Sequence, residues 1–164
     1  MPSRNRLPLR SSEPPDRQRA WQYALRLLTA RDYSAARLRS KLRDKGFSDD
    51  DAEEVVARIV SEGWVNDRRF AERFVESARA SGRYFGYRLR QELQRRGVPS
   101  DVADDVLGGY GGDVDSEILA VCERRFGNFS FDAADDREKR RVVGYLQRRG
   151  FGLSAILRVL RQRR

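Results

Sequence analysis

A threefold internal repeat constrains this sequence more than any other feature. Each copy has two aliphatic residues four positions apart, then a basic residue, a glycine and an apolar residue. The copies run from Leu38 to Phe47, from Leu89 to Val98 and from Val142 to Phe151. Their glycines are 51 and 53 residues apart, and a valine follows nine residues after each glycine. A near-constant period with matching apolar positions indicates one supersecondary unit that is present three times.

Each unit is expected to contain three helices, because its apolar residues recur at helical spacing. The stripe from Ala52 to Val60 shows this best, with apolar residues at i, i+3, i+4, i+7 and i+8. Ser34 and Ser48 are candidate N-caps, and Gly46 is a candidate helix stop. No segment shows the alternation of a strand. The predicted fold class is therefore all-α, with three tandem three-helix repeats stacked in an elongated, curved array.

The repeat also predicts how the chain is divided. We expect a flexible basic tail at residues 1–16, then repeats at 17–65, 66–110 and 111–164, the last with a loop at 127–136. The run from Gly108 to Gly112 lacks the Gly-Lys-Ser/Thr ending of a phosphate-binding loop. It is interpreted as a helix stop or hinge between the second and third repeats.

The residues that are missing exclude several kinds of chemistry. The chain has no histidine, which excludes Ser-His-Asp and Cys-His catalysis and histidine-ligated metals. Cys122 is the only cysteine, and its apolar neighbours predict a buried core residue rather than a reactive thiol. Asp49, Asp50 and Asp51 stand at a predicted helix start, where carboxylates are favoured without a metal. We expect no catalytic residue, no metal, no cofactor and a cytoplasmic location.

Charge is abundant and unevenly distributed. There are 34 Lys and Arg against 25 Asp and Glu, a net charge of +9. Leu, Ile, Val and Phe supply 39 of 164 residues, which exceeds the roughly 20% below which so charged a chain stays disordered. The middle helices are basic: residues 34–45 hold five cations and one acid, residues 86–96 four and one, residues 137–149 six and one. The third helices at 48–62 and 98–107 are acidic, whereas the last helix is basic.

The repeated basic surface is the candidate binding site. Arg37, Arg88 and Arg141 share one repeat position, just before the first apolar anchor, and are expected to reach solvent on the same side of successive units. Arginine can form paired hydrogen bonds with phosphate or carboxylate. The alternative is a solvated helix face that binds nothing. The cation before each terminal glycine is expected to serve the helix dipole. The candidate binding residues are Arg37, Arg39, Lys41, Arg88, Arg90, Arg95, Arg140, Arg141, Arg148, Arg158 and Arg161.

A more specific motif links the first two units. Gly63-Trp64-Val65-Asn66-Asp67 is followed by Phe70-Ala71, with Lys45-Gly46-Phe47 before it and Gly97-Val98 after it. With these motifs, about residues 17 to 160 of the chain resemble the RecX family, the regulators of the bacterial RecA recombinase. We expect Trp64 to be largely buried, Asn66 or Asp67 to cap the following helix, and Phe70 to pack inside.

The resemblance implies a non-enzymatic regulator that binds in the helical groove of the RecA–DNA filament. It implies modulation, mainly inhibition, of recombinase, ATPase and coprotease activities, and so a place in DNA repair, homologous recombination and the SOS response. The implied partner is the RecA filament. Direct contact with DNA stays open, a monomer is expected, and no membrane association is expected. The alternative is a stand-alone helical DNA-binding protein whose basic middle helices enter the major groove.

Overall fold

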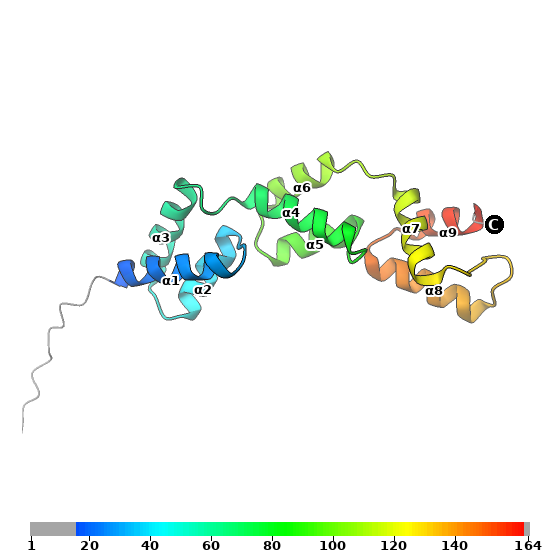
Figure 1. The fold of residues 1–164 in the computed structure, drawn as a ribbon, viewed down its shortest axis with the longest axis horizontal. Helices are drawn as coiled ribbons and strands as arrows, with labels where there is room; N and C mark the ends of the chain where they lie inside the picture. Colours follow the sequence, from blue (N-terminus) through cyan, green and yellow to red (C-terminus); the bar gives the residue numbers. More distant parts are fainter. Residues whose placement is uncertain (1–15, 163–164) are drawn as a thin grey trace, which may run out of the picture.

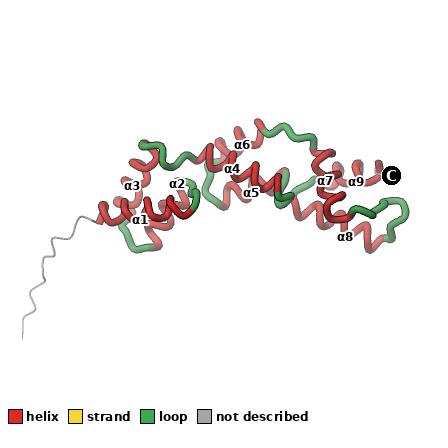
Figure 2. Tube along the Cα trace, in the orientation of Figure 1, coloured by secondary structure: helices red, strands yellow, loops and turns green. Residues whose placement is uncertain are grey.

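The structure, a computed structural model, describes residues 16–162 and contains nine helices and no strand within that range (Figures 1 and 2). The expected tail at residues 1–16 lies outside the described residues apart from Asp16. The helices are α1 (Asp16–Ala30), α2 (Ala35–Asp44), α3 (Asp49–Ser61), α4 (Asp67–Ala80), α5 (Gly86–Arg95), α6 (Ser100–Gly109), α7 (Val114–Phe126), α8 (Asp136–Arg149) and α9 (Leu153–Gln162).

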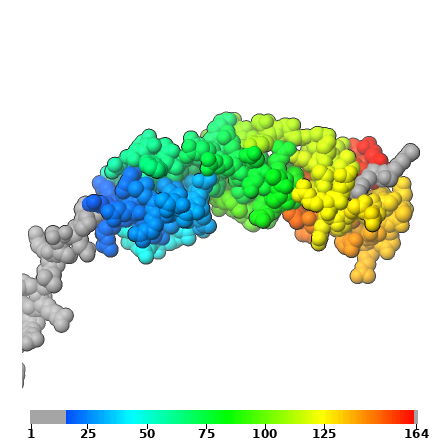
Figure 3. Space-filling model, viewed as in Figure 1, coloured from blue at the N-terminus to red at the C-terminus, as the bar shows by residue number. Residues whose placement is uncertain are grey.

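The helices form three groups of three. Helices α1 and α2 pack against α3, α4 and α5 against α6, and α7 and α8 against α9. The groups follow one another along the long axis of the molecule (Figure 1), and the space-filling view has a gently arched outline (Figure 3). The predicted all-α fold with three stacked repeats is confirmed.

Each repeat has a hydrophobic core of its own. The six aliphatic anchors that define the sequence repeat are all buried: Leu38, Leu42, Leu89, Leu93, Val142 and Leu146. The valines nine residues after the glycines are buried as well. Cys122 lies in the core of the third repeat, as expected. The apolar residues that recur with the period of the sequence therefore form the inner face of each group of helices.

The helix ends follow the predicted capping residues. Ser34, Ser48 and Asn66 each accept a backbone hydrogen bond at the start of α2, α3 and α4, at 3.2, 3.1 and 2.9 Å. The three middle helices end at glycines with positive φ, Gly46, Gly97 and Gly150. These caps satisfy backbone groups that would otherwise lack partners at the helix termini.

Trp64 differs from the expectation, because its side chain is 58% exposed. Gly63 makes a left-handed turn after α3, and the next two side chains then diverge. Val65 enters the core at 3% exposure, while the Trp64 indole stays outside and donates to Glu62 at 3.2 Å. Phe70 is partly buried against the core of the second repeat. The turn admits one of the two apolar residues to the core, and the smaller one takes that place.

The first and second repeats meet through the ends of their middle helices. The C-terminal turn of α5 lies against the N-terminus of α2. Here the Ser34 hydroxyl donates to the carbonyl oxygen of Arg96, and the amide of Ala35 donates to Asp67 at 2.8 Å. A Cβ atom on Gly97 would stand 2.7 Å from the Cβ atom of Ala36, so this turn has no room for a side chain.

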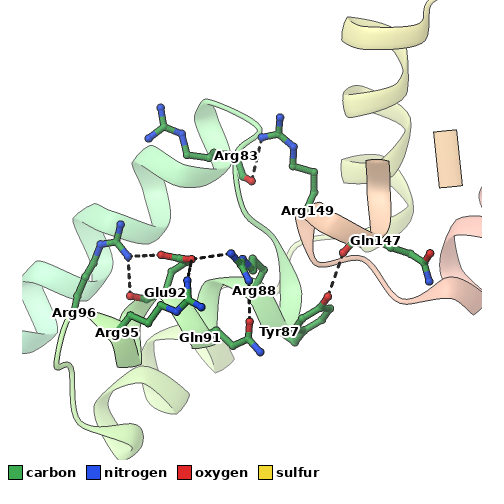
Figure 4. A network of polar contacts seen from close by, with 9 residues as sticks. All are labelled: Arg83, Tyr87, Arg88, Gln91, Glu92, Arg95, Arg96, Gln147 and Arg149. Carbon is green, nitrogen blue, oxygen red and sulfur yellow. Dashed lines mark hydrogen bonds and ion pairs between the residues drawn. The ribbon is translucent and has the colours of Figure 1, made fainter. Parts of the chain in front are cut away.

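The second and third repeats meet in the same way. The C-terminal turn of α8 lies against the N-terminus of α5, where the Phe85 amide donates to the carbonyl oxygen of Arg149 at 2.7 Å. The Phe85 and Phe151 rings stack with their centroids 4.5 Å apart, and the Tyr87 hydroxyl donates to the carbonyl oxygen of Gln147 at 3.2 Å (Figure 4). The three middle helices are therefore joined end to end.

Candidate binding surface

The eleven predicted binding residues lie on four helices. Helix α2 carries Arg37, Arg39 and Lys41, α5 carries Arg88, Arg90 and Arg95, α8 carries Arg140, Arg141 and Arg148, and α9 carries Arg158 and Arg161. Their side chains fall into three classes, which the charge pattern alone did not separate. Some pair with an acidic neighbouring helix, some gather around one buried carboxylate, and some have no ionic partner within residues 16–162.

The first class is neutralised by adjacent helices. Because acidic α3 packs on α2 and acidic α6 packs on α5, Arg39 pairs with Glu53 at 2.5 Å and Arg90 pairs with Asp104. In the third repeat, Arg158 on α9 reaches Asp115 on α7 at 2.6 Å. The hydrogen bond with Asp115 raises the pKa of the Arg158 guanidinium. A ligand of these arginines would have to compete with a carboxylate that is already in place.

The second class surrounds Glu92 (Figure 4). The Glu92 side chain is almost fully buried. Its carboxylate lies 2.6 Å from Arg96, 3.3 Å from Arg88 and 3.4 Å from Arg95. Buried carboxylates require such partners, because an uncompensated charge is costly away from water. Glu92 was not among the predicted residues, although its position four residues after Arg88 and before Arg96 is the spacing of helical ion pairs.

This network corrects the expectation for Arg88. Arg37 and Arg141 are exposed, but Arg88 is half-buried and held between Glu92 and Gln91, whose side-chain oxygen accepts at 3.2 Å. The cause is the residue one turn further on, which differs between repeats. Lys41 takes the corresponding position in α2 and repels the arginine before it, whereas Glu92 in α5 attracts it. Arg37, Arg88 and Arg141 occupy the same repeat position but therefore differ in exposure and in ionic partners.

The third class keeps its charge unpaired. Five predicted residues have no ion pair within the described part of the chain: Arg37, Lys41, Arg140, Arg148 and Arg161. Arg141 has only a long contact of 3.6 Å with Glu138, and both side chains are well exposed. Such exposed pairs contribute little energy. These cations are the ones that a negatively charged partner can reach without breaking an internal contact.

The junction between the first two repeats brings predicted residues together. Arg37 and Arg95 line one hollow of about 350 Å³, although 58 residues separate them in the sequence. Its other lining residues are Arg31, Asp32, Tyr33, Ser34, Phe70 and Arg96. Arg31 donates to the Tyr33 hydroxyl at 2.7 Å, and the one carboxylate, Asp32, is engaged by Arg73 at 2.9 Å. We name this site the junction hollow.

The cations before the terminal glycines do more than serve the helix dipole. Arg96 donates to the carbonyl oxygen of Glu92 at 2.9 Å, within its own last turn, as that role requires. Arg149 instead crosses to the second repeat and donates to the carbonyl oxygen of Gly82 at 3.0 Å. It also donates to the carbonyl oxygen of Arg83 at 3.1 Å, the contact that Figure 4 shows. Arg149 thus ties two repeats together, and nothing in the local sequence signalled this contact.

A second group of predicted residues lies in the third repeat. Arg141 and Arg148 on α8 line a hollow together with Tyr145 of the same helix and with Arg125 and Phe126 at the end of α7. Sequence reasoning missed Arg125, because it stands on the first helix of its unit rather than on a basic middle helix. We name this site the α7–α8 hollow.

The described residues hold no cluster of three or more Cys, Asp or Glu side chains placed to ligate a metal ion. Within the same residues, none of the helices combines the length and the apolar character needed to cross a membrane.

Comparison with known proteins agrees with this architecture. Sequence models described as the first, second and third three-helix domains of RecX match residues 20–58, 66–107 and 113–160. Regulatory protein RecX of Trichlorobacter lovleyi is 48% identical over 143 residues, which cover 86% of this chain and 91% of that protein. The same protein of Syntrophotalea carbinolica is 43% identical over 140 residues, covering 84% and 91%.

A solved structure shares the fold. The crystal structure of RecX from Lactobacillus salivarius superposes with a TM-score of 0.74 at 18% identity, covering 90% of this chain and 96% of that one. The three matched domains coincide with the three groups of helices, and the sequence identity extends over most of the chain. The chain therefore belongs to the RecX family of regulatory proteins.

Proposed function

We propose that this protein is a non-enzymatic regulator that binds the RecA–DNA filament in its helical groove and mainly inhibits the recombinase, ATPase and coprotease activities of RecA. It would act as a cytoplasmic monomer, in DNA repair, homologous recombination and the SOS response. The membership of the RecX family supports this role. The observation that carries the proposal is an elongated array of repeats (Figure 3) in which Arg37, a residue without an ion pair in the described range, lines the junction hollow.

The shape of the array suits a long, repetitive partner. Stacked repeats present an extended surface on which successive units each add a contact. Contacts that are individually weak become strong together when one rigid molecule holds them at fixed spacing. A filament groove, with acidic protein and exposed phosphate on its walls, is a partner that a basic array can follow.

The charges identify which residues can make the first contacts. Arg37 and Lys41 are four residues apart on one face of α2, and neither forms an ion pair within residues 16–162. Arg37 also lines the junction hollow beside Arg95, whose side chain is 66% exposed despite its link to Glu92. By contrast, Arg39 and Arg90 are held by acids of neighbouring helices. We therefore place the first contact with the filament at Arg37 and Lys41.

The experiment is a titration of the protein into RecA assembled on single-stranded DNA, with ATP hydrolysis and filament assembly as the readouts. The parent protein should suppress both. The double variant Arg37→Glu/Lys41→Glu should need at least about tenfold more protein for the same suppression, a loss of about 1.4 kcal/mol in binding. A matched control is Arg26→Glu/Arg83→Glu, which reverses two exposed arginines that have no side-chain partner within the described part.

Two results would contradict the proposal at different levels. If the parent protein leaves RecA assembly and ATP hydrolysis unchanged, the regulatory role is wrong. If both double variants inhibit as well as the parent, the role stands but the placement of the contact at Arg37 and Lys41 is wrong. Equal binding to bare DNA and to RecA-coated DNA would instead favour a stand-alone DNA-binding protein.

A further inference from the structure

The α7–α8 hollow combines unpaired arginines with an aromatic floor. Its volume is about 270 Å³, and its lining is Arg125, Phe126, Arg141, Tyr145 and Arg148. Arg125 and Arg148 are exposed and have no ionic partner within residues 16–162, and Arg141 has only its long contact with Glu138. Three guanidinium groups therefore border one small hollow, and almost none of their positive charge is neutralised by carboxylates of the described residues.

The floor of this hollow is held rigidly by the core of the third repeat. The Phe126 and Tyr145 rings meet edge to face with centroids 5.2 Å apart, and both pack against the buried cluster. Arg149 covers the Tyr145 ring at 4.8 Å and donates to its hydroxyl at 2.8 Å, which fixes the orientation of that ring. The Arg141 guanidinium lies 5.8 Å from the Phe126 centroid. The cations are thus presented on a preformed surface rather than on a mobile loop.

The absence of acids distinguishes this hollow from others on the described surface. Four other hollows each include at least one carboxylate in their lining, from Glu54, Glu117, Glu72 or Asp32. In those places some of the arginines already have internal partners, such as Arg17 with Glu54 at 2.5 Å. No lining residue of the α7–α8 hollow is acidic. The positive charge of its arginines is therefore available to an external ligand.

We propose that the α7–α8 hollow binds a backbone phosphate of a nucleic acid strand, with Arg125, Arg141 and Arg148 as its ligands. Guanidinium groups bind phosphate oxygens through paired, charge-assisted hydrogen bonds. The two partly exposed rings give the adjoining sugar or base an apolar surface, the combination that proteins use for single strands. The size of the hollow suits one phosphate and its sugar, not a base pair. This hollow lies on a different surface from the junction hollow, and phosphate can bind there in the absence of RecA.

The test measures binding of a fluorescently labelled 20-residue oligo-dT by anisotropy, without RecA and over a series of salt concentrations. Arg125→Gln/Arg148→Gln should weaken binding about tenfold at low salt. Each phosphate contact on a single strand contributes about 0.7 to the slope of log K against log salt, so the loss of two contacts should reduce that slope by about 1.4. The control Arg26→Gln/Arg83→Gln removes the same charge from two exposed arginines that line none of these hollows, and should change the affinity less than about threefold.

Three outcomes would overturn the site. Equal weakening by both double variants would show that binding follows net charge and not the hollow. Unchanged binding by Arg125→Gln/Arg148→Gln, with a melting temperature equal to that of the parent, would show that these arginines bind no phosphate. Displacement of the oligonucleotide by polyglutamate at equal charge would show that the hollow takes acidic protein. Since no assay component is RecA, each outcome leaves the proposed action on RecA untouched.

Discussion

Replacing a terminal glycine by alanine should have different effects in different repeats. Gly46 and Gly150 stand at the same repeat position, and both have φ in the left-handed region, +99° and +109°. Nothing lies within 4 Å of a Cβ atom built on Gly46, which faces no neighbouring repeat. A Cβ atom on Gly150 would stand 2.7 Å from the Cβ atom of Arg88 and closer still to the carbonyl oxygen of Phe85. Comparing Gly46→Ala with Gly150→Ala therefore separates the cost of backbone strain from the cost of disturbing the contact between two repeats.

The magnitudes follow from these surroundings. A residue with a Cβ atom costs about 1–2 kcal/mol in a left-handed conformation, and this is the whole expected loss for Gly46→Ala. Gly150→Ala carries the same strain and also forces the junction apart, which weakens the hydrogen bond from Phe85 to Arg149 and the stacking of Phe85 on Phe151. Overpacking of this kind costs about 1–3 kcal/mol more. The smaller freedom of alanine in the unfolded chain cancels in the comparison.

The measurement is urea unfolding of both variants, followed by circular dichroism for the whole chain and by tryptophan fluorescence for the first repeat. Both tryptophans, Trp21 and Trp64, lie in that repeat, so fluorescence isolates it. Gly46→Ala should shift the fluorescence transition. Gly150→Ala should shift the circular dichroism transition more strongly. If the two variants lose the same free energy of unfolding within about 0.5 kcal/mol, the reasoning is refuted, because the second and third repeats would then not dock through the turn at Gly150.

Three further outcomes are expected. Trp64→Ala should lower the free energy of unfolding by less than about 1 kcal/mol, because the indole is mainly exposed; a loss of about 3 kcal/mol in thermal unfolding would place it in the core. Glu92→Gln should cost about 1–3 kcal/mol, since it removes the charge that three arginines share, and a cost no greater than that of Trp64→Ala would show that the network is dispensable. The hydrogen bond from Arg58 lowers the pKa of Glu62, so this pair stabilises the fold above the unfolded pKa and loses that contribution as the pH falls through the lowered value. Arg58→Gln should return the NMR-titrated pKa of Glu62 toward its ordinary value, and an unchanged titration would contradict the stated cause.

Several features of the fold could be predicted because their causes are local. A helical period of apolar residues needs only neighbours within two turns, and a cap such as Ser48 or Asn66 needs only the next three residues. Even the Glu92 network was accessible, since its ion pairs to Arg88, Arg95 and Arg96 all span three or four residues. Sequence reasoning missed it by counting net charge per helix instead of pairing individual positions.

Which charges are neutralised at the surface, and which side chains are exposed there, could not be predicted in the same way. The basic and acidic helices were recognised separately, but only their packing showed that Arg39 and Arg90 are neutralised while Arg37 is not. Trp64 is expected in the core as an anchor of the motif that links the first two units, yet the turn at Gly63 gives that place to Val65. In both cases the deciding contact is set by the direction in which a side chain leaves the backbone, which composition does not specify.

The sequence by itself determined the class of the fold, the number of repeats and the glycine stops, because period and capping depend on residues adjacent along one helix. Only the tertiary structure decided that the middle helices join end to end, which brings Arg37 beside Arg95 and sends Arg149 across to the second repeat. The glycine turns that end α5 and α8 also leave room for the neighbouring repeat to approach, and that fit depends on atoms more than 60 residues away in sequence. Local rules therefore specify each repeat, whereas close packing between repeats specifies which charges remain free to bind.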